Sequence, residues 1–556
     1  DVSTAFIARS HALLVSGGVS LLLTIRGWLF IHQFKDFRSW AWSEFAPQLV
    51  GDFDQGAFSN EVGNLLSIVA VLLRKHGTPT TATSMLPTSF ETRWRNDNRR
   101  AFRKEAGTLG YYQRFDFRPE DLRAIPGQPL IYWWDREFLA RYAASIRIGD
   151  QAPARKGLCT GDDGRFNRQW WEVNTFRASR IHPLSFDDGK ATGGECGWES
   201  ASWAPTIKGA KGTAWFEPLR EVVRWASSGL ELQMFAEVSK GVRFQNTPSY
   251  FRPGIAFSMI GSSFTARAHR YRSVFGNKGS SVFPEDIAGT LCLMNSSAAR
   301  CVLESLNPGV HFEVGDVNRL PLFPIEGAEQ IVARLEEAFT QHEQARETSV
   351  EFRRPGPSPW GYAQQWAQRA VDRPAGAPLP EYEVELEPAG PLDELSYALG
   401  RALGRFDEGG IASGEVEGAL PHGILFLSAS GGPDGLEHAA AAPLREHGEY
   451  LRTRFFADDH LKRYEKRPIY FPLSSEKKSF VVWCSIHRWT SQTLLHVLGL
   501  LQAEANRLQG ELADTAAALT GGDRKSQVAA QKRYDRLVAL SGELAAFLRQ
   551  VQDIAE

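Results

Sequence analysis

The chain has 556 residues, with 63 lysines and arginines, 65 aspartates and glutamates, and a formal net charge of −2 at pH 7. Its length predicts roughly three or four domains, each large enough to bury its own core. The near-neutral balance excludes a uniformly basic surface but neither supports nor excludes DNA binding, because such a site needs only a local cluster of basic residues.

The cysteines are scattered along the chain, without a CxxC pair and without an ordered set of histidines nearby. This spacing argues against a zinc site and against a disulfide framework, and it fits a reducing cytoplasm. The five cysteines are Cys159, Cys196, Cys292, Cys301 and Cys484.

An apolar run occupies residues 13–25 (LLVSGGVSLLLTI). It is shorter than the roughly 20 apolar residues that cross a bilayer, so no membrane association is predicted. The internal Gly17-Gly18 and the following Arg26 indicate a helix, a glycine turn and a buried strand. Because residue 1 is Asp rather than Met, we expect a further part of the gene product to precede it.

Residues 1–78 alternate between predicted helices and strands, as the last part of an α/β layer structure would. Apolar runs with few polar breaks predict a sheet that is covered on both faces. The expected elements are a helix through Leu14, a strand at 19–25, a helix at 32–45, and strands at 49–53 and 65–73.

Residues 79–150 form a predicted connector, in which the periodic pattern weakens. Its basic run at 93–104 (RWRNDNRRAFRK) fits a solvated helix face better than a surface that faces phosphates. An aromatic run, IPGQPLIYWW, follows at 125–134.

Residues 151–325 form a predicted β-rich domain of short segments separated by glycines. Residues 255–271 alternate like strands with one buried face. A helix is expected from Pro284 to about Asn307, with acids in its first turn, where the helix dipole favours them. Residues 310–317 are expected to form a strand.

The most informative segment is GLCTGDDGRFNRQWWEV, at 157–173. Its glycines permit close backbone approach, and its short polar residues stabilise turns. Arg165 and Arg168 offer charge to phosphates, and the two tryptophans offer flat surfaces to bases. The alternative interpretation is a tight turn that enters a strand and whose tryptophans belong to the core.

Residues 326–410 form a predicted helical connector, with an amphipathic helix at 326–350, an irregular segment at 353–391 and a helix at 392–406. Residues 411–556 form a predicted helical support domain that ends in an antiparallel helical hairpin around Gly521-Gly522. The predicted fold class is therefore α/β plus α+β multidomain.

Common catalytic motifs are absent from the sequence. No GxGxxG, P-loop, HExxH or GxSxG pattern occurs. The acidic pairs at 162–163, 187–188 and 458–459 fit solvated turns better than acid–base couples. Taken alone, the sequence does not predict a self-sufficient enzyme, and it assigns no catalytic, cofactor-binding or metal-binding residue.

Five groups of segments, in order, resemble the carboxy-terminal two thirds of large adenine-specific DNA methyltransferases. The resemblance is to the PglX type of BREX phage-defence systems above all, with type II fusion restriction-modification enzymes as relatives. The groups are 1–30; 51–75; 125–134 with 157–173; 251–264 with 277–284 and 291–325; and 391–406 with 460–489.

The resemblance implies that residues 1–78 are the tail of a Rossmann-like methyltransferase sheet and that 151–325 are a DNA target-recognition domain. It also implies N6 methylation of an adenine that is flipped out of the duplex, with S-adenosylmethionine as the methyl donor. The cofactor motif and the Asn-Pro-Pro-Tyr motif of the family are expected upstream of Asp1. S-adenosylmethionine would therefore be bound there and not by the residues of this chain.

Two departures from the family pattern matter. The family loop usually reads Thr-Gly-Asp-Asn, whereas Asp163 occupies the last position here and would repel phosphate if it pointed toward DNA. The loop could therefore contact DNA or only brace the domain. The segment near Gly431 is also shorter than usual in the family. The alternative that the chain resembles a related methyltransferase, such as that of DISARM, therefore stays open.

Double-stranded DNA is the predicted partner, together with other phage-defence proteins. Residues predicted to contact phosphates are Lys156, Arg165, Arg168 and Lys278. Residues predicted to make close polar contacts are Thr160, Asn167, Ser280 and Ser281. Residues predicted to reach base edges are Gln169, Arg252 and Arg267.

Two other functions compete with this prediction. One is a non-catalytic DNA-specificity or scaffold subunit. The other is a carbohydrate-active protein, suggested only by the 16 tryptophans and the many acidic residues.

Overall fold

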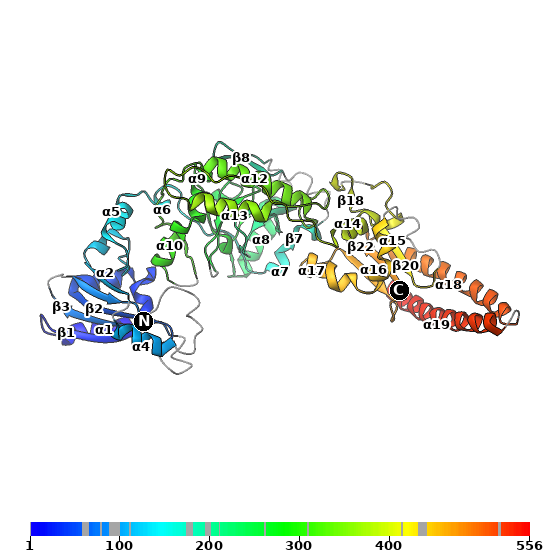
Figure 1. The fold of residues 1–556 in the computed structure, drawn as a ribbon, viewed down its shortest axis with the longest axis horizontal. Coiled ribbons are helices and arrows are strands. Elements are labelled where there is room, and N and C mark those ends of the chain that lie inside the picture. The colour runs from blue at the N-terminus through cyan, green and yellow to red at the C-terminus, as the bar shows by residue number, and fades with distance from the viewer. Residues whose placement is uncertain are drawn as a thin grey trace.

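The fold is a mixed α/β multidomain structure with several sheets, seen in a computed structural model (Figure 1). The structure describes residues 2–57, 66–77, 81–87, 100–110, 113–173, 182–194, 202–210, 212–260, 263–308, 311–412, 415–431, 442–520 and 524–556. The N-terminal sheet lies at one end of the long axis, the β-rich region in the middle, and a helical hairpin at the other end.

The N-terminal region is built around a five-stranded sheet in the order β1-β3-β2-β4-β5. Neighbouring strands are antiparallel except for β2 and β4, which are parallel. The elements are α1 (Val2–Leu13), β1 (Val19–Ile25), α2 (Lys35–Glu44), β2 (Phe45–Asp54), β3 (Ile68–Lys75), β4 (Ala82–Met85), α4 (Arg100–Leu109) and β5 (Arg114–Phe117). The helices and strands predicted before residue 78 are confirmed, and the sheet continues past it because β4 and β5 join it.

The edge strand β1 is covered on one face only. Leu21 and Leu23 are 65% and 57% exposed, whereas the interior strand β3 buries half of its residues. The prediction of a sheet covered on both faces is therefore wrong for β1. An apolar run does not distinguish an edge strand from a central one, because both carry the same residue types.

A buried ion pair joins the connector to this sheet. Arg26 donates to both carboxylate oxygens of Asp52, at 2.7 and 2.9 Å, and the Tyr132 hydroxyl donates to the same carboxylate at 2.9 Å. Burial lowers the pKa of Arg26, but the charge and hydrogen bonds of Asp52 outweigh it and raise that pKa. The connector helices are α5 (Arg136–Ala144) and α6 (Ile148–Gln151). Most of the basic run at 93–104 lies outside the described residues.

The middle region contains two four-stranded sheets, ordered β16-β10-β12-β7 and β11-β15-β14-β17. Its elements are β6 (Cys159–Thr160), α7 (Asp163–Phe166), β7 (Asn167–Gln169), η5 (Trp170–Glu172), β8 (Leu184–Asp187), β9 (Lys190–Gly193), β10 (Trp203–Ile207), β11 (Trp215–Glu217), β12 (Glu221–Arg224), α8 (Ala226–Val238), β13 (Val242–Arg243), β14 (Ile255–Phe257), β15 (Ala266–His269), β16 (Val274–Phe275), η9 (Asn277–Gly279) and β17 (Ser281–Val282). Strands β14 and β15 are buried on both faces, so the prediction of one exposed face for 255–271 is wrong there.

Helices follow these sheets in the chain, namely α9 (Ile287–Asn295), α10 (Ser297–Leu306), α11 (Val314–Val317), α12 (Ala328–Ala345) and α13 (Trp360–Val371). Of these, α9 and α12 pack on the second of the two sheets, and α10 and α13 pack on other helices of the group. The single helix predicted for 284–307 is divided at Ser296, whose hydroxyl accepts from Ala299 N and caps α10.

Two predictions fail in this helical part. The strand predicted at 310–317 is wrong, because Asp316 accepts from the backbone N–H of Glu313 at 3.0 Å and stabilises the first turn of α11. The irregular segment predicted at 353–391 contains α13, which buries Trp366 and Ala363. The helix was not predicted, because the proline-rich residues on either side of it favoured an irregular segment over its apolar stripe.

The C-terminal region combines a three-stranded sheet, β20-β22-β21, with a long helical hairpin. Its elements are α14 (Asp393–Ala402), β18 (Phe406–Asp407), β19 (Gly410–Ile411), β20 (Ile424–Ser428), α15 (Ala442–Glu446), α16 (Gly448–Thr453), a π-helical turn (Phe456–His460), α17 (Leu461–Arg463), β21 (Tyr470–Ser474), β22 (Phe480–Ser485), α18 (Thr493–Ala518) and α19 (Arg524–Ala555). The hairpin is confirmed, but the sheet corrects the prediction of a purely helical domain. Phe426 and Val482 of the sheet share a core with Leu501 and Leu544 of the hairpin.

Across the described ranges, no helix combines the length and apolar character that a membrane span requires.

Candidate nucleic-acid interface

The segment at 157–169 lies beside the segment at 275–279, although the two are far apart in the sequence. Leu158 N donates to Phe275 O at 2.8 Å, and Asn277 N donates to Leu158 O at 3.1 Å. Gly157 makes this approach possible, because a Cβ at that position would lie 1.8 Å from Phe275 O. The structure therefore brings together two of the groups of residues that the sequence assigns to DNA.

Asp163 organises the loop from within. Its Oδ1 accepts from Thr160 Oγ1 at 2.5 Å and from Asn167 Nδ2 at 2.9 Å, and its Oδ2 lies 2.8 Å from Lys208 Nζ. Burial raises the pKa of Asp163, but hydrogen bonds from Lys208 and Thr160 and the charges of Lys208 and Lys278 outweigh it, so the pKa is lowered. Both carboxylate oxygens are thus engaged by groups of the protein.

Lys208 also pairs with Glu221, at 3.1 Å. The sequence analysis did not single out Lys208. No motif surrounds Lys208, and the pairing of β10 with β16 and with β12, which itself pairs with β7, places it beside the loop.

Arg165 and Arg168 lie at the exposed end of the loop. Arg165 pairs with Glu231 at 3.2 Å, and its guanidinium lies over the rings of Phe166 and Phe235. Arg168 donates to two loop carbonyls, those of Gly164 and Asn167, at 2.6 and 2.7 Å. Some of the guanidinium N–H groups of each arginine are therefore already used in contacts that stabilise the loop.

Three other predicted cationic residues are exposed at the surface. Lys156 pairs with Glu313 at 3.0 Å, and Arg252 lies over the ring of Phe283. Lys278, in η9, is exposed, and within the described residues it has no hydrogen bond or ion pair. Because its charge acts on Asp163, Lys278 lies close to the loop.

Three predicted residues are fully buried, and within the described residues all their side-chain polar atoms except Arg267 Nη1 have a partner. The guanidinium of Arg267 pairs with Glu217 and donates to Lys208 O. Ser280 donates to Asn277 O, and Ser281 donates to Gly279 O and contacts His269. In this conformation these three residues stabilise the core of the middle region.

The remaining predicted residues are Thr160 and Asn167, which are buried beside Asp163, and the partly buried Gln169. Within the part of the chain described here, no hydrogen bond reaches Gln169 Oε1 or Asn167 Oδ1, although both atoms are buried. These are two acceptors at the base of the loop that the protein leaves unused.

The tryptophans at the end of the loop pack within the protein. Trp170 and Trp171 are each 2% exposed, and their indole N–H groups donate to Thr348 O at 2.8 Å and to Arg467 O at 3.1 Å. They belong to the same core as Leu399 and Trp483 of the C-terminal region. The interpretation of these tryptophans as core residues is confirmed.

A cavity of about 480 Å³ opens beside this contact. Its lining joins the middle and C-terminal regions and consists of Arg168, Glu172, Val173, Trp203, Lys466, Arg467, Pro468, Phe471 and Ile486. Three basic side chains, Arg168, Lys466 and Arg467, and one acid, Glu172, line this cavity, and Arg467 pairs with Glu172 at 3.1 Å. Lys466 and Arg467 lie in the family-like segment at 460–489, but neither was predicted to contact DNA, because they come from another region of the chain.

Comparison with curated proteins relates the chain to adenine-specific methyltransferases. It is 24% identical over 591 aligned residues to the adenine-specific methyltransferase PglX of Lacticaseibacillus casei (strain Zhang), covering 89% of this chain and 48% of that protein. It is 23% identical over 360 residues to the adenine-specific methyltransferase BrxX of Escherichia coli O9:H4 (strain HS), covering 63% of this chain and 27% of that protein. The chain therefore spans about half or less of the length of these relatives.

Both relatives are adenine-specific methyltransferases, and the chain is homologous to proteins of this class. Within that class the resemblance to the PglX, or BREX, type is confirmed. No protein-family model matches the chain.

Solved structures with partial likeness are restriction-modification enzymes. They include the type ISP enzyme LlaBIII bound to DNA (10% identity, TM-score 0.33, 59% of this chain and 25% of that chain) and the type IIL enzyme MmeI in complex with DNA (11%, 0.36, 67% and 49%). A DrdV–DNA complex is similar at 13% identity and a TM-score of 0.34, over 69% of this chain and 45% of that one. TM-scores of this size do not establish a common overall fold.

The methyltransferase relatives imply S-adenosylmethionine in general, but the described residues do not fit a site for it. A nucleoside cofactor binds at the carboxyl ends of parallel strands, beside a glycine-rich turn into a helix. In the described part of the first sheet only β2 and β4 are parallel neighbours, and no such turn joins them. No chemical step is therefore derived from the cofactor here.

Proposed function

We propose that this chain is the DNA target-recognition and support part of a site-specific adenine-N6 DNA methyltransferase that marks host DNA in phage defence of the BREX type. The observation that carries the proposal is the alignment with PglX, which covers 89% of the chain. The intact protein would use S-adenosylmethionine, held by residues outside this chain, and would act in the cytoplasm, where its DNA substrate lies.

In this proposal residues 151–325 hold duplex DNA by its backbone. Lys278, Lys156 and the exposed donors of Arg165 and Arg168 would contact phosphates, which positions the duplex without reading its sequence. Arg252 and Gln169 would be available for base edges. The engaged carboxylate of Asp163 supports this arrangement, because Lys208 and Lys278 offset its negative charge.

The activity is tested in the host. Methylation-sensitive sequencing with and without the gene should reveal one short adenine motif that is modified only when the gene is present and expressed. A genome with no altered adenine motif, although the full-length protein is produced, would refute the methylation claim. If the protein binds duplex DNA but no motif changes, a non-catalytic specificity or scaffold subunit replaces the methyltransferase as the proposed function.

DNA contact is tested with Lys278→Ala, and Lys532→Ala provides the matched control. Both lysines are exposed, but Lys532 lies on α19, in the hairpin at the far end of the molecule (Figure 1). Loss of one phosphate contact lowers the slope of log K against log salt by about 0.9. Between 50 and 200 mM salt, the affinity of the Lys278 variant should therefore fall about 3.5-fold less than that of the unmodified chain.

Fluorescence anisotropy with duplexes of two unrelated sequences measures these slopes. The effect should be the same for both duplexes, because phosphate contacts carry no sequence information. Equal slopes for the Lys278 variant and the unmodified chain would remove Lys278 from the interface. If the chain did not bind duplex DNA at low salt, the recognition role would be refuted.

A further inference from the structure

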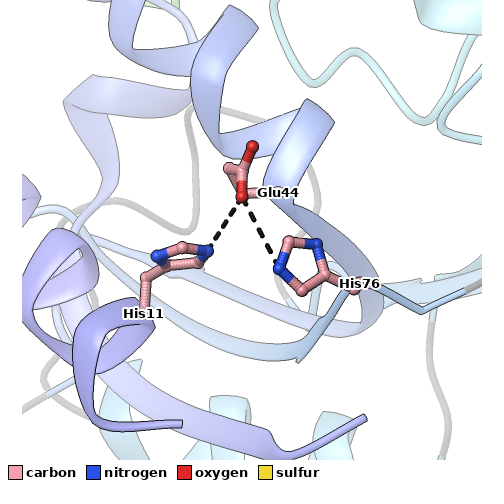
Figure 2. A group of neighbouring side chains, drawn as sticks. All are labelled: His11, Glu44 and His76. Carbon is pink, nitrogen blue, oxygen red and sulfur yellow. Dashed lines mark ion pairs between the residues drawn. The ribbon is translucent and has the colours of Figure 1, made fainter. Parts of the chain in front are cut away.

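Two histidines and a glutamate converge at one end of the first sheet, away from the candidate DNA interface. His11 comes from α1, Glu44 is the last residue of α2, and His76 directly follows β3 (Figure 2). One ligand atom from each of the three side chains lies within 4.8 Å of the others. Figure 2 shows both imidazole rings facing the carboxylate between them.

The distances between the three groups are compatible with a shared cation. His11 Nε2 and His76 Nε2 lie 2.9 and 3.8 Å from the same atom, Glu44 Oε2. Neighbouring ligand atoms in a tetrahedral zinc site lie about 3.3 Å apart, given bonds of about 2.0–2.1 Å. The second distance is too long for a hydrogen bond. His11 Nε2 is buried, and its 2.9 Å contact with Glu44 Oε2 is an ion pair that lacks the geometry of a hydrogen bond.

The protein holds the three groups in place before any ion binds. The His11 ring packs edge-on against Trp40 and Phe45, with ring centroids 5.5 and 5.3 Å apart. His76 N donates to Glu44 O at 2.8 Å. His76 also has a φ of +48°, a left-handed conformation that non-glycine residues seldom adopt and that is enriched at functional sites.

Charge and access also suit a cation. The ammonium group of the neighbouring Lys75 donates to the carbonyls of His11 and Leu14, at 2.9 and 2.8 Å. The side chains of His11, Glu44 and His76 are 22%, 28% and 46% exposed. An ion can therefore enter on the His76 side, and a water molecule can complete the coordination.

We propose that His11, Glu44 and His76 bind one divalent transition-metal ion of the zinc class. Two neutral imidazole nitrogens and one carboxylate oxygen are ligands that zinc accepts, and three protein ligands leave a fourth position for water. The ion would join α1 to the end of α2 and to the end of β3. Its binding would therefore stabilise the N-terminal sheet, independently of any role in DNA recognition.

The experiment uses the 556-residue chain, stripped of metal with a chelator, and Zn²⁺ or Co²⁺ as the probe. Competition with a chromophoric chelator gives the Zn²⁺ stoichiometry and affinity, and Co²⁺ gives visible absorption bands that report the coordination geometry. We expect one tightly bound Zn²⁺ per chain and a rise in Tm when Zn²⁺ is added. His76→Asn and Glu44→Gln should each weaken binding at least about 100-fold, since loss even of an outer-shell partner costs 10–100-fold. Asn tolerates the left-handed backbone, and Gln keeps the shape of Glu44.

His422→Asn is the matched control. His422 also has a left-handed backbone (φ +59°), and its ring stacks on His496 with centroids 3.6 Å apart, so it tests binding by an unrelated histidine pair. This variant should keep the Zn²⁺ affinity and the rise in Tm. The proposal is overturned if the unmodified chain binds less than one Zn²⁺ at micromolar concentrations. It is equally overturned if His76→Asn and Glu44→Gln bind Zn²⁺ as the unmodified chain does, or if only His422→Asn loses it. Circular dichroism of each variant establishes that it is folded.

Discussion

Gly157→Ala tests the contact on which the candidate DNA interface depends. A Cβ at residue 157 would lie 1.8 Å from Phe275 O, whereas real Cβ contacts essentially never fall under 3.0 Å. The two segments must therefore separate by roughly 1.2 Å, because close-packed interiors offer no space for the added methyl group. That shift breaks the hydrogen bonds from Leu158 N to Phe275 O and from Asn277 N to Leu158 O.

The magnitude follows from these two bonds. At about 1 kcal/mol each, their loss destabilises the middle region by about 2 kcal/mol. For a unit of 150–250 residues this corresponds to a fall in Tm of about 4–8 °C. Since Lys278 follows the displaced segment, the DNA affinity should fall together with the local stability.

Calorimetry gives the Tm, and hydrogen exchange read by mass spectrometry locates the change in peptides that contain residues 157–160 and 275–279. Gly209→Ala is the control, because no atom lies within 4 Å of a Cβ at that exposed position. Its effect should stay within about 0.5 kcal/mol. Unchanged exchange and an unchanged Tm in Gly157→Ala would refute the reasoning, because the close approach of the two segments would then not exist.

Two further predictions concern charge. Asp163→Asn removes a negative charge beside Lys208 and Lys278. The repulsion between that charge and a DNA phosphate roughly 8 Å away in water is worth about 0.5 kcal/mol, so the affinity for duplex DNA should rise about two- to threefold. Weaker binding in the anisotropy assay would mean that the carboxylate is needed to hold the loop. Burial and the charges of Arg463 and Arg405 lower the pKa of His460 to about 3, and the neutral ring accepts from Tyr470 N at 3.2 Å. The His460 imidazole of the unfolded chain binds a proton near pH 6.5, whereas that of the folded chain does not. Protonation of the unfolded state should therefore lower the free energy of unfolding by about 2 kcal/mol between pH 6.5 and 5, and should not lower it above pH 6.5. His460→Gln, which does not titrate, should flatten this part of the Tm-against-pH curve, and an equally steep curve would contradict the assignment.

Local structure was predictable wherever one periodic pattern dominated. The strands at 19–25 and 68–75 and the terminal hairpin have apolar spacing that fits a single element type, and they are confirmed. The strand predicted at 310–317 failed because a short helix there is stabilised by Asp316, a side-chain contact that periodicity does not represent. The apolar sequence of β1 likewise gave no sign of its exposed face.

The candidate site was predictable in its segments but not in its side-chain directions. The loop at 157–173 and the segment at 277–281 were each singled out, and the structure places them side by side. The burial of Arg267 against Glu217 depends on pairing between β11 and β15, which the sequence does not reveal. Lys208 lies beside Asp163 because β10 pairs with β16 and with β12, and these strand pairings are not evident in the local sequence.

The proposed metal site shows the same limit. Its three residues come from separate elements with no recognisable spacing. Cysteine pairs and ordered histidines reveal zinc ligands that are close together in the sequence. They do not reveal ligands that only the fold brings together.

The contact made by Trp170 and Trp171 bears on how new specificities could arise in such proteins. Under the proposed function, residues 151–325 would be the natural segment to exchange between relatives. These two tryptophans, however, are buried against Leu399, Trp483 and Tyr464 of the C-terminal region. In a chimera joined at residue 325, the tryptophans of one protein would pack against the C-terminal core residues of another. The mismatch in this core would lower the stability of the chimera. The smallest unit of inheritance that keeps this core intact is therefore the recognition region together with its C-terminal partner.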